Sequence, residues 1–130
     1  MEPMFLGLRH VALNVRDVHK SVDFYSRVLG LKIEWAPDED NVYLTSGQDN
    51  LAIHKQPAGS EPGPAQIVHH IGFLVRTPAN VDEWAERLRA LGIPLVQEPK
   101  THRDGARSIY FHDPHGLLIQ LIYHPPISDG

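Results

Sequence analysis

The sequence contains one short α/β pattern twice, and this internal repeat constrains the fold more than any other feature. Residues 9–16 read Arg-His-Val-Ala-Leu-Asn-Val-Arg and align with residues 69–76, His-His-Ile-Gly-Phe-Leu-Val-Arg, at an offset of 60. Both segments alternate in the way that is typical of a β-strand. They also place His10 and His70 at matching positions. The chain is therefore expected to fold as two copies of one unit.

A helix is predicted after each of these strands. In the first copy, Asp17 is a candidate N-cap for a helix that ends at Gly30. In the second copy the helix begins at Thr77 or Asn80 and ends at Gly92, and Asn80 with the glutamate three residues later resembles a capping box. Both glycines are expected to adopt the positive φ that ends a helix.

Three further strands are predicted after each helix, separated by turn residues. They span residues 32–35, 41–45 and 51–55 in the first copy and 95–98, 108–112 and 117–123 in the second. The predicted fold class is α+β, with two tandem βαβββ modules forming a curved mixed sheet. The modules are expected at residues 5–56 and 67–125 of a single domain, 1–130, and a Pro- and Gly-rich linker at 57–66 joins them.

Composition excludes several classes of function. The chain has no cysteine, so disulfides, thiolate metal sites and cysteine nucleophiles are absent. A net charge of −4 without a Lys/Arg cluster argues against nucleic acid. No apolar run is long enough for a membrane span, and no secretory signal is recognisable, so we expect a cytoplasmic protein. The content of nine histidines in 130 residues is unusually high.

The pattern of histidines indicates a metal site. Alternation along the strands puts His10 beside Ala12 on one face and His70 beside Gly72 on the matching face, which leaves space for a ligand. Counting from the preceding turns makes His54 and Gln120 equivalent at an offset of 66. The candidate ligands of one divalent transition metal (Fe, Ni, Zn, Mn or Co) are thus His10, His54, His70 and Gln120. The alternative is that each is a hydrogen-bonded core or rim residue.

The chain resembles the vicinal oxygen chelate superfamily, which includes glyoxalase I, extradiol dioxygenases, fosfomycin-resistance enzymes and bleomycin-resistance proteins. The resemblance lies in four stretches, which span residues 9–15, 21–31, 69–73 and 110–120. It implies paired βαβββ modules that curl into a cup around a divalent metal, with ligands from the first and last strands of each module. It also implies a homodimer, with the cup formed within one chain or between chains.

The chain departs from that family at the last-strand ligands. Members with a metal usually carry glutamate there, whereas this chain has His54 and Gln120. An amide cannot accept a proton at neutral pH, so a glyoxalase reaction would lack its usual base. In the loop before residue 108, His102 resembles the active-site histidine of ring-cleaving members and is the candidate catalytic residue. Arg103 and Arg107 are candidates for binding an anionic substrate.

The leading interpretation is a metal-dependent enzyme acting on a small substrate with vicinal oxygens. Its reaction would be dioxygenase-like ring cleavage or glyoxalase-like lyase or isomerase chemistry. The alternatives are a metal-free small-molecule-binding protein of the bleomycin-resistance type and a nonenzymatic interaction module. The strand aromatics are predicted to be core or cavity lining, and His69 is expected to face away from His70. These aromatics are Phe5, Trp35, Tyr43, Phe73, Tyr110 and Phe111.

Overall fold

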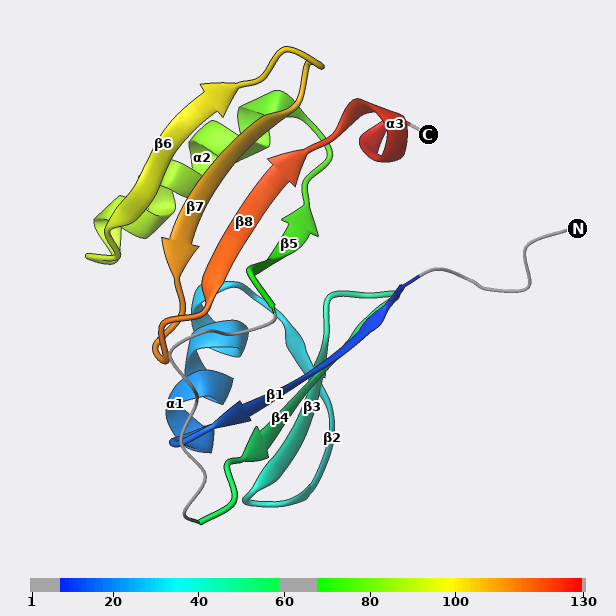
Figure 1. Ribbon diagram of the computed structural model, residues 1–130, viewed down its shortest axis with the longest axis vertical. Helices are drawn as coiled ribbons and strands as arrows, with labels where there is room; N and C mark the ends of the chain where they lie inside the picture. The colour runs from blue at the N-terminus through cyan, green and yellow to red at the C-terminus, as the bar shows by residue number, and fades with distance from the viewer. Residues whose placement is uncertain (1–7, 59–67, 130) are drawn as a thin grey trace, which may run out of the picture. The chain divides into compact units, whose positions relative to one another are not determined.

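The computed structural model describes residues 8–58 and 68–129 and forms two compact units that divide between residues 62 and 63. Phe5 and most of the predicted linker 57–66 lie outside the described residues. Unit 1 contains β1 (His10–Val15), α1 (Val18–Asp23), the π-helical turn η1 (Phe24–Val28), β2 (Lys32–Asp38), β3 (Asn41–Thr45) and β4 (Asn50–Lys55). Unit 2 contains β5 (His70–Leu74), α2 (Pro78–Ala90), β6 (Leu95–Thr101), β7 (Arg107–His112), β8 (Leu118–Tyr123) and α3 (Pro125–Ser128) (Figure 1).

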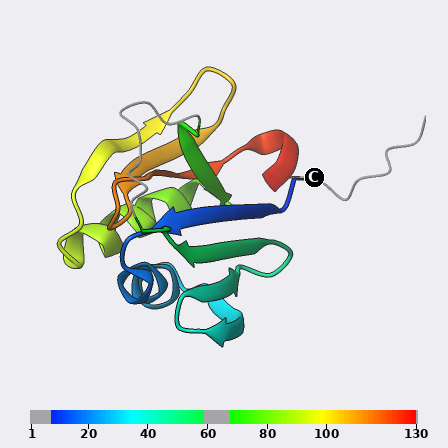
Figure 2. The ribbon, with the colours of Figure 1, turned by 60° about the horizontal axis from the view of Figure 1, so that its bottom comes forward.

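Each unit is a four-stranded mixed sheet covered on one face by its helix. The strand orders are β1-β4-β3-β2 and β5-β8-β7-β6, and the first strand of each unit pairs in parallel with the last. Helix α1 packs against β3 and β4 (Figure 2), and α2 packs against β6, β7 and β8. The fully buried side chains of these layers include Tyr25, Leu44, Ile53, Leu88, Ile109 and Ile119. The predicted α+β fold with two βαβββ modules is confirmed.

The helix boundaries follow the predicted caps with one correction. The Asp17 carboxylate accepts the Lys20 backbone N–H at 3.0 Å, and Gly30 and Gly92 take φ values of +83° and +75°. The capping box of α2, however, is formed by Thr77 and Asn80 rather than by Asn80 and the following glutamate. Pro78 explains the difference, because proline is well suited to the first helical position and so places the N-cap at residue 77.

The second strand of each unit is longer than predicted. Strand β2 continues through Pro37 to Asp38, where a turn was expected, and β6 continues to Thr101. Both are edge strands. A proline at a sheet edge can leave its missing N–H on the solvent side, so it does not interrupt the ladder.

The strand registers show that one predicted equivalence is wrong. Ala12 pairs with Ala52 in unit 1, and the matching Gly72 pairs with Gln120 in unit 2. Gln120 therefore corresponds to Ala52. His54 corresponds instead to Ile122, because these residues pair with positions 14 and 74. The β3–β4 and β7–β8 connections differ in length, which is why counting from the turns gave the wrong offset. No helix of the described residues is long and apolar enough to cross a membrane.

Candidate metal and substrate site

His10 lies on the sheet face that points away from the helix, which we call the open face. Hydrogen bonds fix the orientation of its ring. Its Nδ1 lies 2.8 Å from Asn50 Oδ1, and the Asn50 amide nitrogen donates to Glu34 Oε1 at 3.1 Å. The carboxylate therefore turns the amide oxygen toward the imidazole. His10 must carry its proton on Nδ1 to donate to that oxygen. Its Nε2 lone pair is left available to a metal.

His54 has a second network of the same kind. Its Nδ1 lies 2.7 Å from Asn41 Oδ1, and the Asn41 amide nitrogen donates to both oxygens of Asp38, at 2.9 and 3.1 Å. The same reasoning places the proton of His54 on Nδ1 and leaves Nε2 as an acceptor. In unit 1, therefore, two strand histidines are each oriented by an asparagine and a carboxylate.

His10 and His54 of one chain are too far apart to bind the same metal ion. His10 pairs with Asn50, and His54 lies four residues farther along β4, which is about 13 Å at the rise of a β-strand. Two imidazoles on one metal must bring their nitrogens within about 4 Å of each other, because each bond is about 2.1 Å long. The two side chains belong to separate positions on the open face.

His70 begins β5, and its ring is held by two neighbours. His70 Nδ1 lies 2.8 Å from His69 Nδ1, and its ring packs edge-on against Tyr110 with centroids 5.4 Å apart. The expectation that His69 points away from His70 is wrong. His69 precedes the strand, so the alternation that the expectation assumed does not apply to it.

Gln120 lies in the middle of the open face of unit 2. It pairs with Gly72 on one side and with Tyr110 on the other. A Cβ added to Gly72 would stand 3.5 Å from Gln120 Oε1. This is an ordinary van der Waals distance, so a methyl group would also fit beside the amide oxygen. Within unit 2, His70 and Gln120 are neighbours on the same face, two residue positions apart in register.

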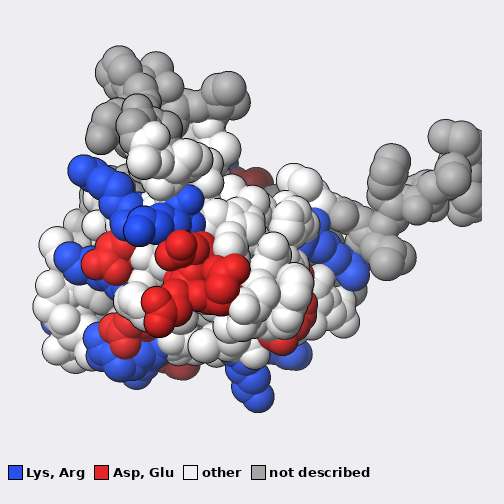
Figure 3. All heavy atoms as spheres, turned by 90° about the horizontal axis from the view of Figure 1, so that it is seen from below, with Lys and Arg blue, Asp and Glu red and all other residues white. Residues whose placement is uncertain are grey.

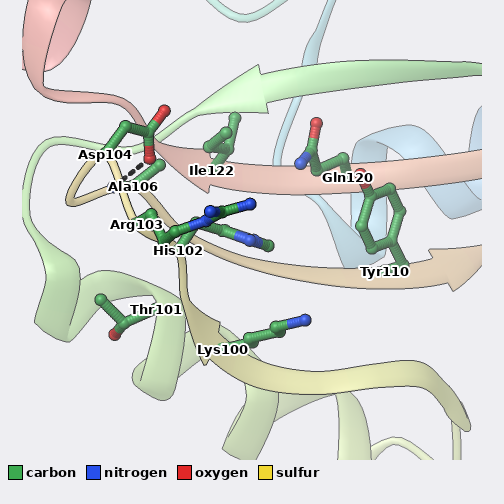
Figure 4. Close-up of a pocket in the computed structure, with 9 residues that line it drawn as sticks. All are labelled: Lys100, Thr101, His102, Arg103, Asp104, Ala106, Tyr110, Gln120 and Ile122. Carbon is green, nitrogen blue, oxygen red and sulfur yellow. Dashed lines mark hydrogen bonds between the residues drawn. The ribbon is translucent and has the colours of Figure 1, made fainter.

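A cavity of about 680 Å³ opens beside Gln120 in unit 2. Figure 4 shows His102 and Arg103 extending toward the side of Gln120 and Tyr110, with Lys100 directed the same way from β6. The Asp104 carboxylate instead turns back and accepts the Ala106 backbone N–H at 3.0 Å. The cavity is lined by Lys100, Thr101, His102, Arg103, Asp104, Ala106, Tyr110, Gln120 and Ile122. Its inward-facing charges are therefore cationic.

The hydrogen bonds around Ser108 determine the tautomer of His102. Ser108 is fully buried, and its Oγ contacts Gln97 Nε2 at 3.4 Å and His102 Nε2 at 3.0 Å. Gln97 Nε2 also donates to the Ser108 carbonyl at 3.3 Å, which fixes the amide with its nitrogen toward the serine. The hydroxyl accepts from the Gln97 amide and keeps its own O–H available for His102 Nε2, and we assign the hydrogen bond in that direction. With this assignment, His102 accepts on Nε2 and carries its proton on Nδ1.

The two candidate arginines have different roles. Arg107 points toward α2, where it forms an ion pair with Asp82 at 2.7 Å and donates to Thr101 Oγ1 at 2.8 Å. The hydrogen bond from Arg107 lowers the pKa of the Asp82 carboxyl below its ordinary value. Arg107 thus joins β7 to the helix, whereas Arg103 lines the cavity.

Charges on the side seen in Figure 3 are mixed. A compact group of acidic side chains lies at its centre, bordered by lysines and arginines, and no continuous basic surface is present among the described residues of this side. The exposed acidic run in the β2–β3 turn, residues 38–40, belongs to unit 1.

Sequence reasoning missed the residues that orient the histidines. Asn41 and Asn50 could have been recognised, because asparagine is disfavoured in strands and both occupy strand positions in unit 1. Ser108 and Gln97 gave no comparable signal. Within the described ranges, no three His, Cys, Asp or Glu side chains converge as a metal site. A neutral ligand such as Gln120 falls outside that set.

The family model described as the Glyoxalase/Bleomycin resistance protein/Dioxygenase superfamily matches residues 7–121. The chain is 27% identical to the fosfomycin resistance protein FosX of Listeria innocua, over 91% of this chain and 90% of FosX. It is 29% identical to the metallothiol transferase FosB of Shouchella clausii, over 91% and 80% of the two chains. The lactoylglutathione lyase structure from Agrobacterium tumefaciens aligns with a TM-score of 0.78 at 22% identity, covering 96% and 98%.

Proposed function

Because the chain belongs to the glyoxalase/bleomycin resistance protein/dioxygenase superfamily, we propose that it is a divalent-metal-dependent enzyme acting on a small molecule. The proposed ligands are His10 from unit 1 and His70 and Gln120 from unit 2. Two imidazole nitrogens and one amide oxygen suit a first-row transition metal such as Mn, Fe, Co, Ni or Zn. When bound, such an ion supplies Lewis-acid polarisation of a substrate oxygen.

The single observation that carries the proposal is the orientation of His10. A histidine that binds a metal through Nε2 commonly donates its Nδ1–H to a fixed acceptor, which sets the tautomer and the ring plane. Asn50, itself held by Glu34, provides that acceptor at 2.8 Å. For His70, the proposal requires that Nδ1–H donates to His69 Nδ1 at 2.8 Å, so that Nε2 is free.

The reaction we propose does not use a carboxylate base at the last-strand position. Gln120 is neutral and cannot remove a proton. Lys100 and Arg103 would bind an anionic group of the substrate, and His102 would donate its Nδ1–H to a substrate oxygen. This combination supports addition to a small oxygen-bearing anion, and one of the relatives, FosB, is named as a metallothiol transferase. Ring cleavage and glyoxalase-like isomerisation remain the alternatives for the same site.

Metal analysis of the untagged, full-length protein tests the proposal. Wild type incubated with Mn, Fe, Co, Ni or Zn should retain about one ion per chain after desalting. His10→Ala and His70→Ala should each lose it. The matched controls are His19→Ala in α1 and His115→Ala in the β7–β8 turn, which should keep the metal. A wild-type protein that stays metal-free with all five ions would favour the alternative of a metal-free binding protein.

The family resemblance also leads us to propose a homodimer, which light scattering of the purified chain measures directly. A monomer at all accessible concentrations would contradict this part of the proposal. The metal assignment rests on separate observations and would stand.

A further inference from the structure

The short helix α3, which follows β8 in unit 2, is fastened to the end of the sheet by one serine. The Ser128 hydroxyl donates to the Val75 carbonyl, just beyond β5, at 2.9 Å. The same oxygen accepts the His124 backbone N–H at 3.1 Å. These two hydrogen bonds hold α3 across the ends of β5 and β8.

A side-chain hydrogen bond joins the two ends of α3. The Tyr123 hydroxyl is at the last position of β8, and it lies 2.9 and 2.8 Å from the two carboxylate oxygens of Asp129, the residue after α3. This hydrogen bond raises the pKa of Tyr123 above its ordinary value. The phenol therefore keeps its proton at neutral pH and can donate it to the carboxylate.

The first residue of α3 lies beside the tip of the β6–β7 loop, residues 102–106. Gly105 at the tip has a φ of +89°. A Cβ added to Gly105 would stand 3.6 Å from Pro125 Cγ, so a single methyl group would bring the loop and α3 into van der Waals contact. Figure 1 shows α3 at the same end of unit 2 as this loop. The loop that carries His102 and Arg103 is therefore bordered by α3.

Hydrogen bonds inside the loop connect its tip to His102. The Gly105 N–H donates to the His102 carbonyl at 3.0 Å, and the His102 N–H donates to the Ala106 carbonyl at 2.7 Å. These bonds fix the shape of the loop, but they lie within it and do not fix its tilt against the sheet. A neighbour outside the loop is needed for that, and α3 is in the right place.

Unit 1 shows that the βαβββ fold does not require this arrangement. Strands β2 and β3 are joined by residues 39–40 alone, whereas residues 102–106 join β6 and β7. The described residues that follow β4, 56–58, form no helix. The additional helix thus occurs in the unit that has the longer hairpin loop, which is consistent with a supporting role.

We propose that α3 is a strap that positions the 102–106 loop, closed by the hydrogen bond between Tyr123 and Asp129, and that it holds His102 and Arg103 toward the cavity. Tyr123 and Asp129 do not line the cavity, so they are positioning residues. The inference rests on the proposed function for the roles of His102 and Arg103. Its test needs neither metal nor substrate, so the two proposals can fail separately.

Hydrogen exchange of the full-length, metal-free, ¹⁵N-labelled protein tests the closing bond. Tyr123→Phe keeps the ring and removes the donor, so exchange of the Gly105 amide should become about fivefold faster, the factor that one hydrogen bond of typical net strength represents. Asp129→Ala should have the same effect, and the double variant should be no faster than either. Asp129→Asn keeps an acceptor oxygen and should stay close to wild type.

Two outcomes of this measurement would contradict the proposal. One is an unchanged Gly105 amide in both Tyr123→Phe and Asp129→Ala. The other is equal acceleration of Gly105 and of the strand amides in both units, because a general loss of stability would then explain the effect.

The imidazole of His102 reports whether the strap positions the loop as well as its own helix. Tyr123→Phe combined with Ser128→Ala releases both fastenings in the full-length chain. The hydrogen bond of 3.0 Å between His102 Nε2 and Ser108 should then form for only part of the time. Long-range ¹H–¹⁵N spectra at about pH 8, where an ordinary imidazole is neutral, should show a changed tautomer ratio. An unchanged His102 spectrum would mean that α3 fastens only the end of the sheet, and the proposal would be wrong.

Tyr43→Phe is the matched control, because it removes a tyrosine hydroxyl from β3 of unit 1. The Tyr43 ring stacks on Trp35 with centroids 5.1 Å apart. Trp35 itself is 60% exposed, which corrects the expectation that it lies in the core or lines a cavity. Tyr43→Phe should leave Gly105 exchange and the His102 spectrum as in wild type. Effects as large as those of Tyr123→Phe would refute a specific role of the strap.

Discussion

At the scale of single residues, the hydrogen-bond partners of the histidines determine what each can do. The tautomer of His102 depends on a hydroxyl that is fully buried and held by Gln97. Replacing Ser108 by Ala removes the hydroxyl that we assign as the donor to Nε2, so the imidazole is expected to move toward the Nε2–H tautomer. Long-range ¹H–¹⁵N spectra distinguish the two forms directly. Ser21→Ala removes the other fully buried serine hydroxyl of the described core and should leave His102 unchanged. An unaltered His102 spectrum in Ser108→Ala would refute the assignment.

Gln120 offers a second test at this scale. Gln120→Glu replaces a neutral oxygen by a charged one in nearly the same position. If Gln120 contacts the metal, Coulomb attraction should raise the affinity about tenfold or more, even with strong dielectric screening. Competition with a chelator measures the change. The control is Gln97→Glu on β6. Gln97 pairs with Tyr110, which in turn pairs with Gln120, so the control residue lies two strands away from Gln120. Equal affinities of wild type and Gln120→Glu would show that the side chain does not bind the ion.

At the scale of secondary-structure elements, α2 is joined to β7 by the Arg107–Asp82 pair at 2.7 Å. Both groups are partly exposed, so Asp82→Asn should lower the free energy of unfolding by only about 0.5–1 kcal/mol at pH 7. The pKa of Asp82 is lowered in the folded state. Its contribution is therefore complete above the unfolded pKa of about 4 and is lost as the pH falls through the lower folded value. Urea unfolding of both proteins at pH 7 and pH 2.5 measures the difference, which should be smaller at the lower pH. Glu86→Gln, in a more exposed pair on the same helix, should change stability less.

The element scale also shows where sequence reasoning succeeds and where it stops. The strands, the glycine helix ends and the order of elements follow from local patterns, because alternation and capping are properties of neighbouring residues. The register of β4 against β1 depends on loop length and on packing. A shift of two residues keeps every side chain on its own face, so alternation could not reveal that Ala52, not His54, matches Gln120. For the same reason, the pairing of Asn50 with His10 and of Asn41 with His54 was visible only in the structure.

At the scale of the whole molecule, the duplication has kept the fold and changed the chemistry of its two copies. Unit 1 carries two oriented histidines and an aromatic pair, and unit 2 carries His70, Gln120 and a cationic cavity. Neither unit contains three of the proposed ligands. Under the proposed ligand set, metal binding should therefore be lost when either His10 or His70 is replaced.

Metal-dependent stability tests this last step. A ligand at 100 times its dissociation constant stabilises the folded state by about 2.7 kcal/mol, which corresponds to an increase of about 10 °C in Tm for a chain of this size. Wild type should show this increase in calorimetry when the preferred ion is added. His10→Ala and His70→Ala should each abolish it, although they lie in different units, while His54→Ala should retain it. If His10→Ala keeps the full increase while His70→Ala loses it, the ion is bound by unit 2 residues without His10, and the ligand set must be revised.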